Sequence, residues 1–437
     1  MNESAASDRF LLCLIDAGGT VPPALGLARA LLTRGHRVRV LADPTIEADA
    51  RAAGCAFSPW REAPHFNSRA EQTALLGAAE GGNPFRALKA VRRYAGKATT
   101  RRFAADVVST VEQFPVDAIL SDGVPGILIG AQATGLPTAT LMAQIYVRPT
   151  AGLPLVGTGW SPARGVLGRA RDTVIPHLAS WLLARTLPRL NLVTADYGQP
   201  PLREVFELFD RCRRVLVMTS ASFDFPAPWL PDNVRYVGPQ LDDPEWAVGD
   251  RWQRRGTNPL VLVAASSVYQ DQTDMLRRVA QALGRLPVRG LLTTGPAVQL
   301  AAVSAPSNVE VLRAVPHRRV LPEASVVVTH AGHGTVLKTL AAGVPMVCMP
   351  MGRDQKDNTI RVLRLGAGVR ISKRATPHQI AAAISEVLDH PHYTDAARRF
   401  ADVLAWEAAN LPSAADEAVA LLSSCTPKQI NKDKGGH

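Results

Sequence analysis

Short apolar runs alternate with helical patterns along most of the chain, and this alternation limits the possible folds more than any other feature. Residues 9–15 (RFLLCLI) form an apolar run that is soon followed by Gly18-Gly19, which is typical of a buried parallel strand. Residues 22–34 have helical periodicity and stop at Gly35, a common residue after a helix. Alternating strands and helices predict βαβ units around a parallel sheet.

The same alternation occurs twice, in two halves of similar size. In the first half, further strands are expected at residues 37–41, 118–120, 138–141 and 214–218, and the last of these is expected to end that half. After a polar stretch the pattern restarts, with strands expected at residues 260–264, 288–293, 309–312, 325–329 and 346–349. Ligands of doubly wound sheets bind beyond the carboxyl ends of the strands. Two such halves that face each other would therefore create a cleft with one ligand on each side.

Composition excludes several other classes of protein. Hydrophobic residues make up 46% and charged residues 20% of the 437 residues, which provides a sizeable core and excludes disorder for most of the chain. The five cysteines are far apart and include no CxxC pair. We therefore expect a protein of the reducing cytoplasm, without a disulfide framework or a zinc ribbon.

Charge and hydropathy argue against nucleic-acid and membrane partners. The formal net charge is +11, but the arginines are spread along the chain in pairs, so a solvated surface that favours a small anion is the simpler interpretation. The apolar run at residues 10–15 is too short for a secretory signal. The longest uncharged stretch, residues 123–147, contains glycines and a proline, so we expect a helix, a turn and a strand there and no stable membrane insertion.

Residues 327–358 contain the pattern that carries chemistry. His330 follows a predicted strand, and Gly332 and Gly334 allow the backbone to turn tightly and to approach a ligand. Thr335 is expected to cap the following helix, whose free N–H groups and dipole would bind a phosphate. His330 would add a side-chain donor to the same phosphate oxygens.

A polar loop is expected at residues 352–358, after the next strand. There Asp354 and Gln355 offer an acceptor and a donor side by side, which suits sugar hydroxyls. A metal cluster can also be drawn from His330, His333, Asp354 and Asp357. We favour the phosphate role for His330 and expect no metal site.

These residues closely resemble the nucleotide-sugar signature of family 1 glycosyltransferases with the GT-B fold. The resemblance spans nearly the whole chain and is greatest to bacterial natural-product glycosyltransferases. It implies an α/β fold with two Rossmann-like, doubly wound parallel-sheet domains that face each other across a cleft. The signature reads His-x-Gly-x-(Gly/Asn)-(Ser/Thr), then Gly-Val-Pro, then Asp-Gln, and it is matched by His330, Gly332, Gly334, Thr335, Gly343-Val344-Pro345 and Asp354-Gln355.

The resemblance assigns further donor-binding residues. Val315 and His317 lie in a segment similar to the family's base-binding turn, where they would bracket the nucleobase. Ser266 and Ser267 resemble the serine that contacts the diphosphate, and Thr294 lies in a matching Thr-Thr-Gly segment. Enzymes of this type resemble metal-independent catalysts, so a nucleoside-diphosphate sugar is expected as co-substrate, without a cofactor.

The resemblance and the composition together suggest how the chain divides. We expect disordered tails at both ends, an acceptor-binding Rossmann-like domain, a polar linker, a nucleotide-sugar-binding Rossmann-like domain, and a last helix that packs back on the first domain. The expected tails are residues 1–7 and 426–437. The acceptor-binding domain is expected at residues 8–230, the linker at 231–259, the nucleotide-sugar-binding domain at 260–405 and the last helix at 406–425.

One departure from the family pattern bears on the nucleotide. Many relatives that use uridine nucleotides carry a glutamate three residues after the Ser/Thr, where it grips both ribose hydroxyls, and Lys338 stands at that position here. An ammonium group only donates hydrogen bonds. We therefore expect thymidine diphosphate to be favoured over uridine diphosphate, unless Lys338 simply points to solvent or to a phosphate.

A second departure concerns the general base. In the family, a histidine after the first strand usually deprotonates the acceptor, and an aspartate from a later loop orients it. Gly18 and Thr20 occupy the positions of the usual bases here, whereas Asp122 matches the orienting aspartate. Asp16, at the end of the same strand, is the predicted base, because two nearby carboxylates would raise one pKa and share a proton.

Other interpretations of Asp16 and of the whole chain remain open. Asp16 could instead satisfy N–H groups of its loop, the acceptor could need little help, or His65 or His177 could act as base. The resemblance implies an inverting glycosyltransferase, monomeric or homodimeric, that acts on a small, largely apolar natural product. The alternatives are a sugar-nucleotide epimerase of the same fold and a degenerate scaffold that partners another glycosyltransferase.

Overall fold

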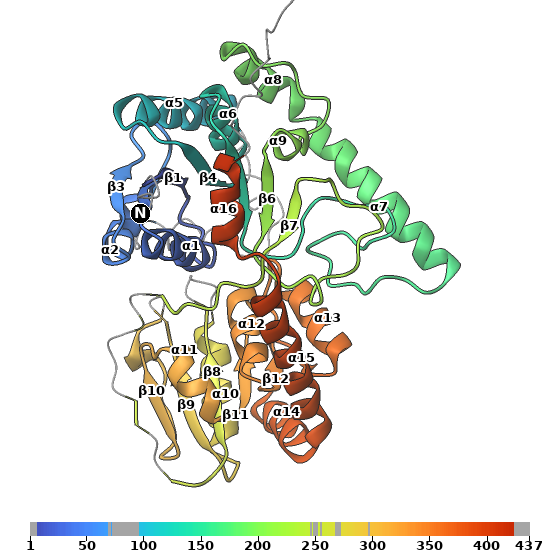
Figure 1. Cartoon of the computed structure of the whole chain (residues 1–437). Coiled ribbons are helices and arrows are strands. Elements are labelled where there is room, and N and C mark those ends of the chain that lie inside the picture. Colours follow the sequence, from blue (N-terminus) through green and yellow to red (C-terminus); the bar gives the residue numbers. More distant parts are fainter. Residues whose placement is uncertain are drawn as a thin grey trace, which may run out of the picture.

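The chain folds around two parallel β-sheets, which lie in separate parts of the molecule (Figure 1). The computed structural model describes residues 7–68, 71, 96–244, 247, 252–253, 256–266, 272–295 and 298–423. Every strand pair in both sheets is parallel, as strands joined through helices require. The prediction of two doubly wound α/β domains is confirmed.

The first sheet has the strand order β3-β2-β1-β4-β5-β6-β7. Side chains alternate along β1, so that Phe10 and Leu12 pack with α1 while Leu11 and Cys13 pack with α5 and α6 on the opposite face. The strands are β1 (Arg9–Cys13), β2 (Arg37–Ala42), β3 (Ala56–Pro59), β4 (Ala118–Asp122), β5 (Thr138–Met142), β6 (Arg214–Val217) and β7 (Val234–Tyr236). The helices are α1 (Val21–Thr33), α2 (Glu47–Ala52), α5 (Lys97–Gln113), α6 (Pro125–Ala133), α7 (Val166–Ala184), α8 (Leu187–Asp196) and α9 (Glu207–Asp210).

The second sheet has the strand order β10-β9-β8-β11-β12-β13. Along β8, Leu262 packs with α12 and α15, whereas Val263 packs with α10 and α14. The strands are β8 (Leu260–Ala264), β9 (Arg289–Thr293), β10 (Val309–Leu312), β11 (Ala324–Thr329), β12 (Met346–Cys348) and β13 (Gly368–Arg370). The helices are α10 (Thr273–Leu283), α11 (His317–Val320), α12 (His333–Ala341), α13 (Gln355–Leu365), α14 (Pro377–Asp389), α15 (Pro391–Asn410) and α16 (Ala414–Ser423).

Two elements differ from the expectation in ways that affect the site. β7 lies inside the segment expected to be a linker and pairs with β6, so the expectation that residues 214–218 end the first half is wrong. A three-residue strand is too short to show periodicity in the sequence. α13 begins at Gln355, so the polar loop expected at residues 352–358 ends earlier and its second half is helical.

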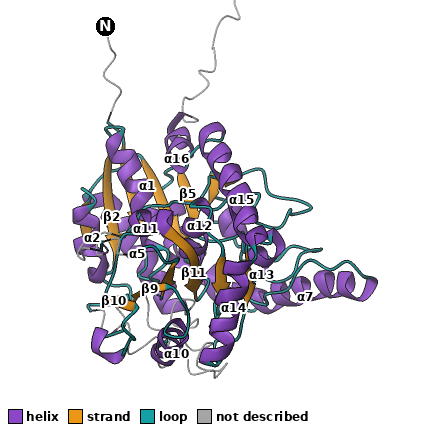
Figure 2. Ribbon diagram, turned by 90° about the horizontal axis from the view of Figure 1, so that it is seen from below, coloured by secondary structure: helices purple, strands orange, loops and turns teal. Residues whose placement is uncertain are grey.

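The C-terminal segment contacts both domains. α15 packs on the second sheet, and α16 returns to the first, where Ala414, Ala418 and Leu421 join the cluster that contains α1. Glu417 of α16 also pairs with Arg214 of β6 at 2.8 Å. Figures 1 and 2 show that α7, in contrast, projects away from the body of the molecule. No helix in the described part of the chain combines the length and apolar character needed to cross a bilayer.

Candidate active site

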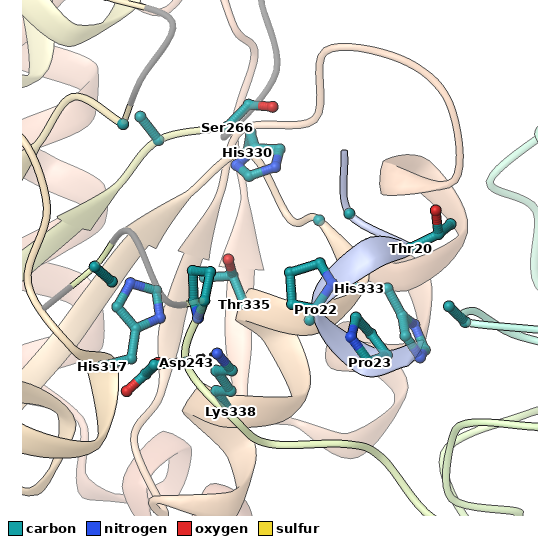
Figure 3. Close-up of a pocket in the computed structure, with 18 of the residues that line it drawn as sticks. Thr20, Pro22, Pro23, Asp243, Ser266, His317, His330, His333, Thr335 and Lys338 are labelled. Carbon is teal, nitrogen blue, oxygen red and sulfur yellow. Dashed lines mark hydrogen bonds and ion pairs between the residues drawn. The ribbon is translucent and has the colours of Figure 1, made fainter. Parts of the chain in front are cut away.

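A cavity of about 550 Å³ lies where the two domains meet (Figure 3). The first domain contributes the loop after β1 with the start of α1, and the loop after β5. The second domain contributes the segments after β8, β9, β10 and β11 and the start of α13, while residues 240–244 add the connection between the domains. The cavity therefore lies beyond the carboxyl ends of strands of both sheets, where doubly wound folds bind ligands.

The amino end of α12 faces this cavity without a protein cap. Gly332 is the N-cap residue, and among the described residues no side chain caps the helix and none in its first turn is acidic. His333, Gly334 and Thr335 form that first turn and line the cavity. Thr335 was expected to be the cap and lies inside the helix instead. The N–H groups of a first turn have no partner within the helix and attract anions.

The space at Gly334 is open. A Cβ atom added there would meet no described atom within 4 Å, although Gly334 lines the cavity. At Gly332, in contrast, a Cβ would lie 2.5 Å from Nε2 of His330, so the glycine makes room for the imidazole. Ala331, between His330 and Gly332, has a φ of 66°, which is uncommon for a residue with a side chain. The backbone turn that was predicted from the two glycines is therefore present and tight.

His330 is buried at the end of β11 and lines the cavity. Its Nδ1 lies 3.5 Å from the carbonyl oxygen of Ala264, which is a long contact. Burial lowers the pKa of His330 to about 4, so the imidazole of the ligand-free protein is neutral near pH 7. An anion beside the ring would reverse this preference, because it stabilises the imidazolium.

An ion pair lies near Val315 and His317, the two residues predicted to bracket the nucleobase. Val315 and His317 both line the cavity. Lys338 lies with its Nζ 2.9 Å from Oδ1 of Asp243, and the backbone N–H of Arg318 donates to Oδ2 of the same carboxylate at 3.1 Å. Burial and then the charge of Lys338 lower the pKa of His317 to about 4. Lys338 thus points to a carboxylate of the connecting segment rather than to solvent.

Asp354 and Gln355 both line the cavity, but they belong to the start of a helix. Gln355 is almost fully buried, and its amide oxygen accepts hydrogen bonds from the N–H groups of Met351 (2.7 Å) and Gly352 (3.1 Å). Asp354 accepts a hydrogen bond from the side-chain amide of Asn358 at 2.8 Å. Gln355 therefore stabilises the turn before α13. The sequence predicted a loop here and did not predict this structural role.

The remaining predicted donor residues divide into three cases. Ser266 lines the cavity, and its backbone N–H and carbonyl are held by the side chain of Gln272. Ser267 lies outside the described residues. Thr294 is fully buried and is not part of the cavity wall, whereas its neighbours Thr293 and Gly295 are. Successive side chains in extended chain point in opposite directions, which places Thr294 on the side away from the cavity.

The two predicted catalytic carboxylates do not belong to the residues that line the cavity. The carboxylate of Asp16 accepts hydrogen bonds from the N–H of Gly18 (3.2 Å) and the hydroxyl of Thr45 (2.7 Å). Asp122 accepts one from the N–H of Ile15 at 2.8 Å, and burial raises its pKa to about 7. In this geometry Asp16 satisfies a backbone N–H group of its own loop and a hydroxyl of the segment after β2.

A third buried carboxylate, Asp43, was missed by the sequence reasoning. Asp43 follows β2 and accepts hydrogen bonds from the N–H groups of Asp16 (2.8 Å) and Phe66 (2.7 Å). Burial raises its pKa, and the charge of Asp16 adds to this effect. The sequence held a signal, since Asp16, Asp43 and Asp122 each stand at or just after the end of a predicted strand. Together they fix the loops at the ends of β1, β2 and β4.

The alternative metal cluster finds no support in the geometry. His333 and Asn358 hydrogen-bond each other, and Asp357 accepts from the N–H groups of Gly157 and Gly159 of the first domain. Among the described residues, no three or more histidine, cysteine, aspartate or glutamate side chains come together as metal ligands would.

Comparison with solved structures identifies the class of protein. The calicheamicin glycosyltransferase CalG4 aligns with a TM-score of 0.70 at 22% identity, over 97% of this chain and 100% of that chain. The glycosyltransferase VinC, solved in complex with DTDP, aligns with a TM-score of 0.65 at 19% identity, over 95% of this chain and 98% of that chain. The fold is therefore that of GT-B glycosyltransferases, as the resemblance implied.

Sequence comparison places the chain within that class. The family model described as UDP-glucoronosyl and UDP-glucosyl transferase matches residues 166–404, and the chain belongs to this family. It is 29% identical to 4'-demethylrebeccamycin synthase of Lentzea aerocolonigenes, over 90% of this chain and 95% of that protein. It is 26% identical to UDP-glucosyltransferase avaP of Aspergillus versicolor, over 82% of this chain and 85% of that protein. The chain is thus a glycosyltransferase of this family.

Proposed function

We propose that this enzyme transfers a sugar from a nucleoside diphosphate to a small, largely apolar natural product, with inversion at the anomeric carbon. The main support for donor binding is the amino end of α12, which has no side-chain cap. It lies in a cavity shared by both domains, next to His330 and to the open space at Gly334. Such an end binds a diphosphate through backbone donors and the helix dipole. The same donors stabilise the charge that develops on the leaving diphosphate.

The composition of the opposite wall supports an apolar acceptor. In the described part of the first domain, the residues that line the cavity are Ala17, Gly19, Thr20, Pro22, Pro23, Ala143 and Gln144. Small apolar side chains and prolines predominate, with one hydroxyl and one amide. The inversion follows from the resemblance to inverting glycosyltransferases and is part of the proposal.

We propose a positioning role for Asp16 and Asp122, in place of direct base catalysis. Asp16 holds Gly18 and Thr45, and Asp122 holds Ile15, so both fix the loop that carries Thr20 to the cavity wall. An acidic acceptor, such as a phenol or a ring nitrogen, would need little help to lose its proton. Asp16→Asn should then lower kcat/KM without changing its pH profile, whereas loss of the acid limb, the fall in kcat/KM at low pH, would restore Asp16 as the base.

We infer that thymidine diphosphate is favoured over uridine diphosphate. Lys338 donates to Asp243, whose other oxygen accepts from Arg318, so this carboxylate is already engaged. Lys338 itself offers no acceptor to a ribose hydroxyl at the position of the family's glutamate, which favours a deoxyribose. VinC was solved in complex with DTDP, which agrees with this inference, whereas avaP is named as a UDP-glucosyltransferase.

The experiment that tests the function is a turnover assay with both nucleotides. The protein is incubated with thymidine- or uridine-diphosphate glucose and a panel of aromatic and polyketide aglycones, and products are detected by mass spectrometry. We expect a glycosylated product of inverted anomeric configuration by NMR, formed faster from the thymidine donor. Absence of any product, together with no nucleotide-dependent rise in melting temperature, would contradict the proposal.

A charge-swapped pair tests the nucleotide inference separately. The double variant Lys338→Glu/Asp243→Lys keeps one ion pair but moves the carboxylate onto α12, where the family's glutamate stands. We expect the ratio of the dissociation constants for uridine and thymidine diphosphate to fall by about tenfold, roughly the effect of one added hydrogen bond to a charged group. Calorimetry measures both constants. An unchanged ratio in a folded variant would show that this pair does not read the ribose.

A further inference from the structure

His333 lines the cavity at the first position of α12 (Figure 3). Its side chain is about nine-tenths buried and meets the edge of Phe223, with ring centroids 5.9 Å apart. The sequence suggested only a metal cluster for this residue, and that cluster is not present among the described side chains. His333 is therefore a polar side chain in the site without an assigned task.

A chain of hydrogen bonds fixes which nitrogen of His333 carries the proton. The amide nitrogen of Asn358 donates to the carbonyl of Ala331 (3.0 Å) and to Oδ2 of Asp354 (2.8 Å). Its amide oxygen therefore faces Nδ1 of His333, at 3.2 Å. An amide oxygen accepts only, so Nδ1 is the protonated nitrogen. Burial lowers the pKa of His333, and in the neutral ring Nε2 then carries a lone pair.

That Nε2 atom is buried and has no hydrogen-bond partner among the described residues. A buried acceptor without a partner is unfavourable, and a bound O–H group would relieve this. Resting on the proposed function, we propose that His333 Nε2 accepts a hydrogen bond from one hydroxyl of the transferred sugar. A diphosphate on the first turn of α12 would hold its sugar close to this residue, and Asp354 and Asn358 would keep the ring in the accepting tautomer.

The test uses thymidine-diphosphate glucose and its analogues that each lack one hydroxyl of the sugar. In the wild type, removal of one particular hydroxyl should weaken binding about tenfold, and the other analogues should bind nearly as well as the parent. In His333→Asn, whose amide can replace Nδ1 but not Nε2, that difference should shrink to about twofold. His333→Gln, whose amide reaches farther, should restore part of it.

The outcome separates this inference from the proposed function. If the wild type binds the parent sugar nucleotide but loses nothing on removal of any single hydroxyl, the His333 inference is wrong and the donor site stands. The same holds if His333→Asn discriminates as sharply as the wild type. If the wild type binds none of the nucleotides, the proposed function itself fails. Circular dichroism establishes that each variant is folded.

A different observation concerns α7, which projects from the first domain (Figures 1 and 2). Only Asp172 and Pro176 are buried in this 19-residue helix, whereas Leu167 is 89% and Trp181 55% exposed. Leu167, Val174, Leu178 and Trp181 follow one another at intervals of seven, four and three residues, which places them on one face of the helix. All of them are exposed.

The charges around this apolar face are of one sign. Residues 160–192 contain five arginines (Arg164, Arg169, Arg171, Arg185 and Arg189) and a single acidic residue, Asp172. Asp172 is buried and paired with Arg171 at 2.7 Å. A second copy of this helix would bring the same positive charge against it, which opposes self-association. An anionic surface complements both the charge and the apolar face.

We propose that α7 binds the surface of an anionic lipid bilayer. A helix with Trp and Leu on one face and arginines around it lies in the interface between headgroups and acyl chains, and anionic lipids strengthen this binding. The projection of α7 allows this contact without a clash with the two domains. An apolar acceptor would also concentrate in such a bilayer.

Vesicle sedimentation tests this second proposal. The wild type should pellet with vesicles of phosphatidylcholine that contain about one-third phosphatidylglycerol, should not pellet with pure phosphatidylcholine, and should be released by high salt. The variant Leu178→Ser/Trp181→Ser should lose binding, whereas the control Trp406→Ser, at an exposed tryptophan of α15, should keep it. Failure to pellet would overturn the proposal, as would a dimer in light scattering that only the α7 variant abolishes.

Discussion

Gly334 offers the most direct test of the diphosphate site at the scale of a single residue. Its position has room for a methyl group in the ligand-free protein, and it is not in a conformation that requires glycine. Gly334→Ala should therefore fold normally, but its Cβ would occupy space beside the first turn of α12. We expect nucleotide-sugar affinity to fall about tenfold or more, measured by calorimetry.

A matched control for this variant is Gly165→Ala. Gly165 also has open space at its Cβ position and lies before α7, outside the cavity wall. Its affinity for nucleotide sugars should equal that of the wild type. Equal affinity in Gly334→Ala as well would mean that the diphosphate does not lie against this turn.

The state of His330 predicts a pH dependence of binding. Burial lowers the pKa of His330 from 6.5 to about 4. His330 is therefore protonated at a much lower pH in the folded, ligand-free protein than in the unfolded chain. Its contribution to stability therefore decreases as the pH falls from about 6.5 to 4. A diphosphate next to the ring raises this pKa again, so binding takes up a proton and tightens as the pH falls from about 7 to 5.

Calorimetry with thymidine-diphosphate glucose measures this effect, because the diphosphate of a sugar nucleotide has no secondary ionisation in that range. Titrations in two buffers with different ionisation enthalpies should reveal proton uptake by the wild type and none by His330→Asn. The same affinity at every pH in the wild type would exclude the contact between His330 and the diphosphate.

The sequence predicted which single residues line the cavity better than it predicted the contacts among them. His330, Gly332 and Gly334 are recognisable because a strand, a turn and a helix follow each other within a few residues. The hydrogen bonds of Asn358 with His333 and Ala331 join residues more than 20 positions apart, and nothing local marks them. Asp243 was missed for the same reason, since its partner Lys338 is 95 residues away.

At the scale of elements, the ends of β1, β2 and β4 bring together the carboxylates Asp16, Asp43 and Asp122, and Asp122 predicts a pH dependence of stability. Burial, together with the charge of Asp43, raises the pKa of Asp122 from 3.8 to about 7. Folding thus favours the protonated form. The resulting stabilisation is complete below about pH 3.8 and is lost as the pH rises through 7.

Asp122→Asn removes this titration, because an amide is neutral throughout. The stability of the wild type relative to the variant should therefore decline as the pH rises from about 5 to 8, measured by urea unfolding. Asp117→Asn, just before the other end of β4, provides the opposite control: Arg9 lowers the pKa of Asp117, so its stabilisation is present at neutral pH and is lost in acid. A parallel trend in both variants would contradict the assignment.

Strands and helices were predictable where apolar residues recur regularly along the chain. β8 is a continuous apolar run and β11 has an apolar centre of three valines, and helices such as α6 and α14 end near glycine, proline or polar residues. β3, β7 and β13 have only three or four residues, so their identity depends on pairing with a neighbouring strand. The start of α13 was expected to be a loop because its first residues, Gln-Lys-Asp-Asn, are polar, although three of these four are the buried Gln355, Asp357 and Asn358. They are buried because the first domain and the turn after β11 cover them.

At the scale of the whole molecule, α13 connects the donor site to the first domain. Asp357 accepts hydrogen bonds from the N–H groups of Gly157 (2.6 Å) and Gly159 (3.0 Å). One turn later, Arg361 pairs with Asp224 at 2.5 Å, and both side chains are about 95% buried. Asp357 and Arg361 lie one turn apart on the same face of α13, so two successive turns of the helix that begins with Gln355 are held by the other domain.

The pair between Arg361 and Asp224 yields the last prediction. Asp224 also accepts hydrogen bonds from the N–H of Tyr146 and the hydroxyl of Tyr236, both at 2.9 Å, so Arg361→Met would leave a buried carboxylate with its hydrogen bonds but without its countercharge. Removal of one partner of a buried ion pair typically lowers stability by about 3–5 kcal/mol. The exposed Arg364→Met, on the same helix, should change it by less than about 0.5 kcal/mol.

Because α13 carries Asp354 and Gln355 into the cavity, the loss should not be confined to stability. At a temperature where Arg361→Met is still folded by circular dichroism, the KM for the sugar nucleotide should rise while Arg364→Met remains normal. The double variant Arg361→Met/Asp224→Leu removes both charges and should regain much of the stability, since two apolar side chains can replace a buried pair. If the single and double variants were equally unstable, the contact would act through packing, and the charge pair would not be what joins α13 to the first domain.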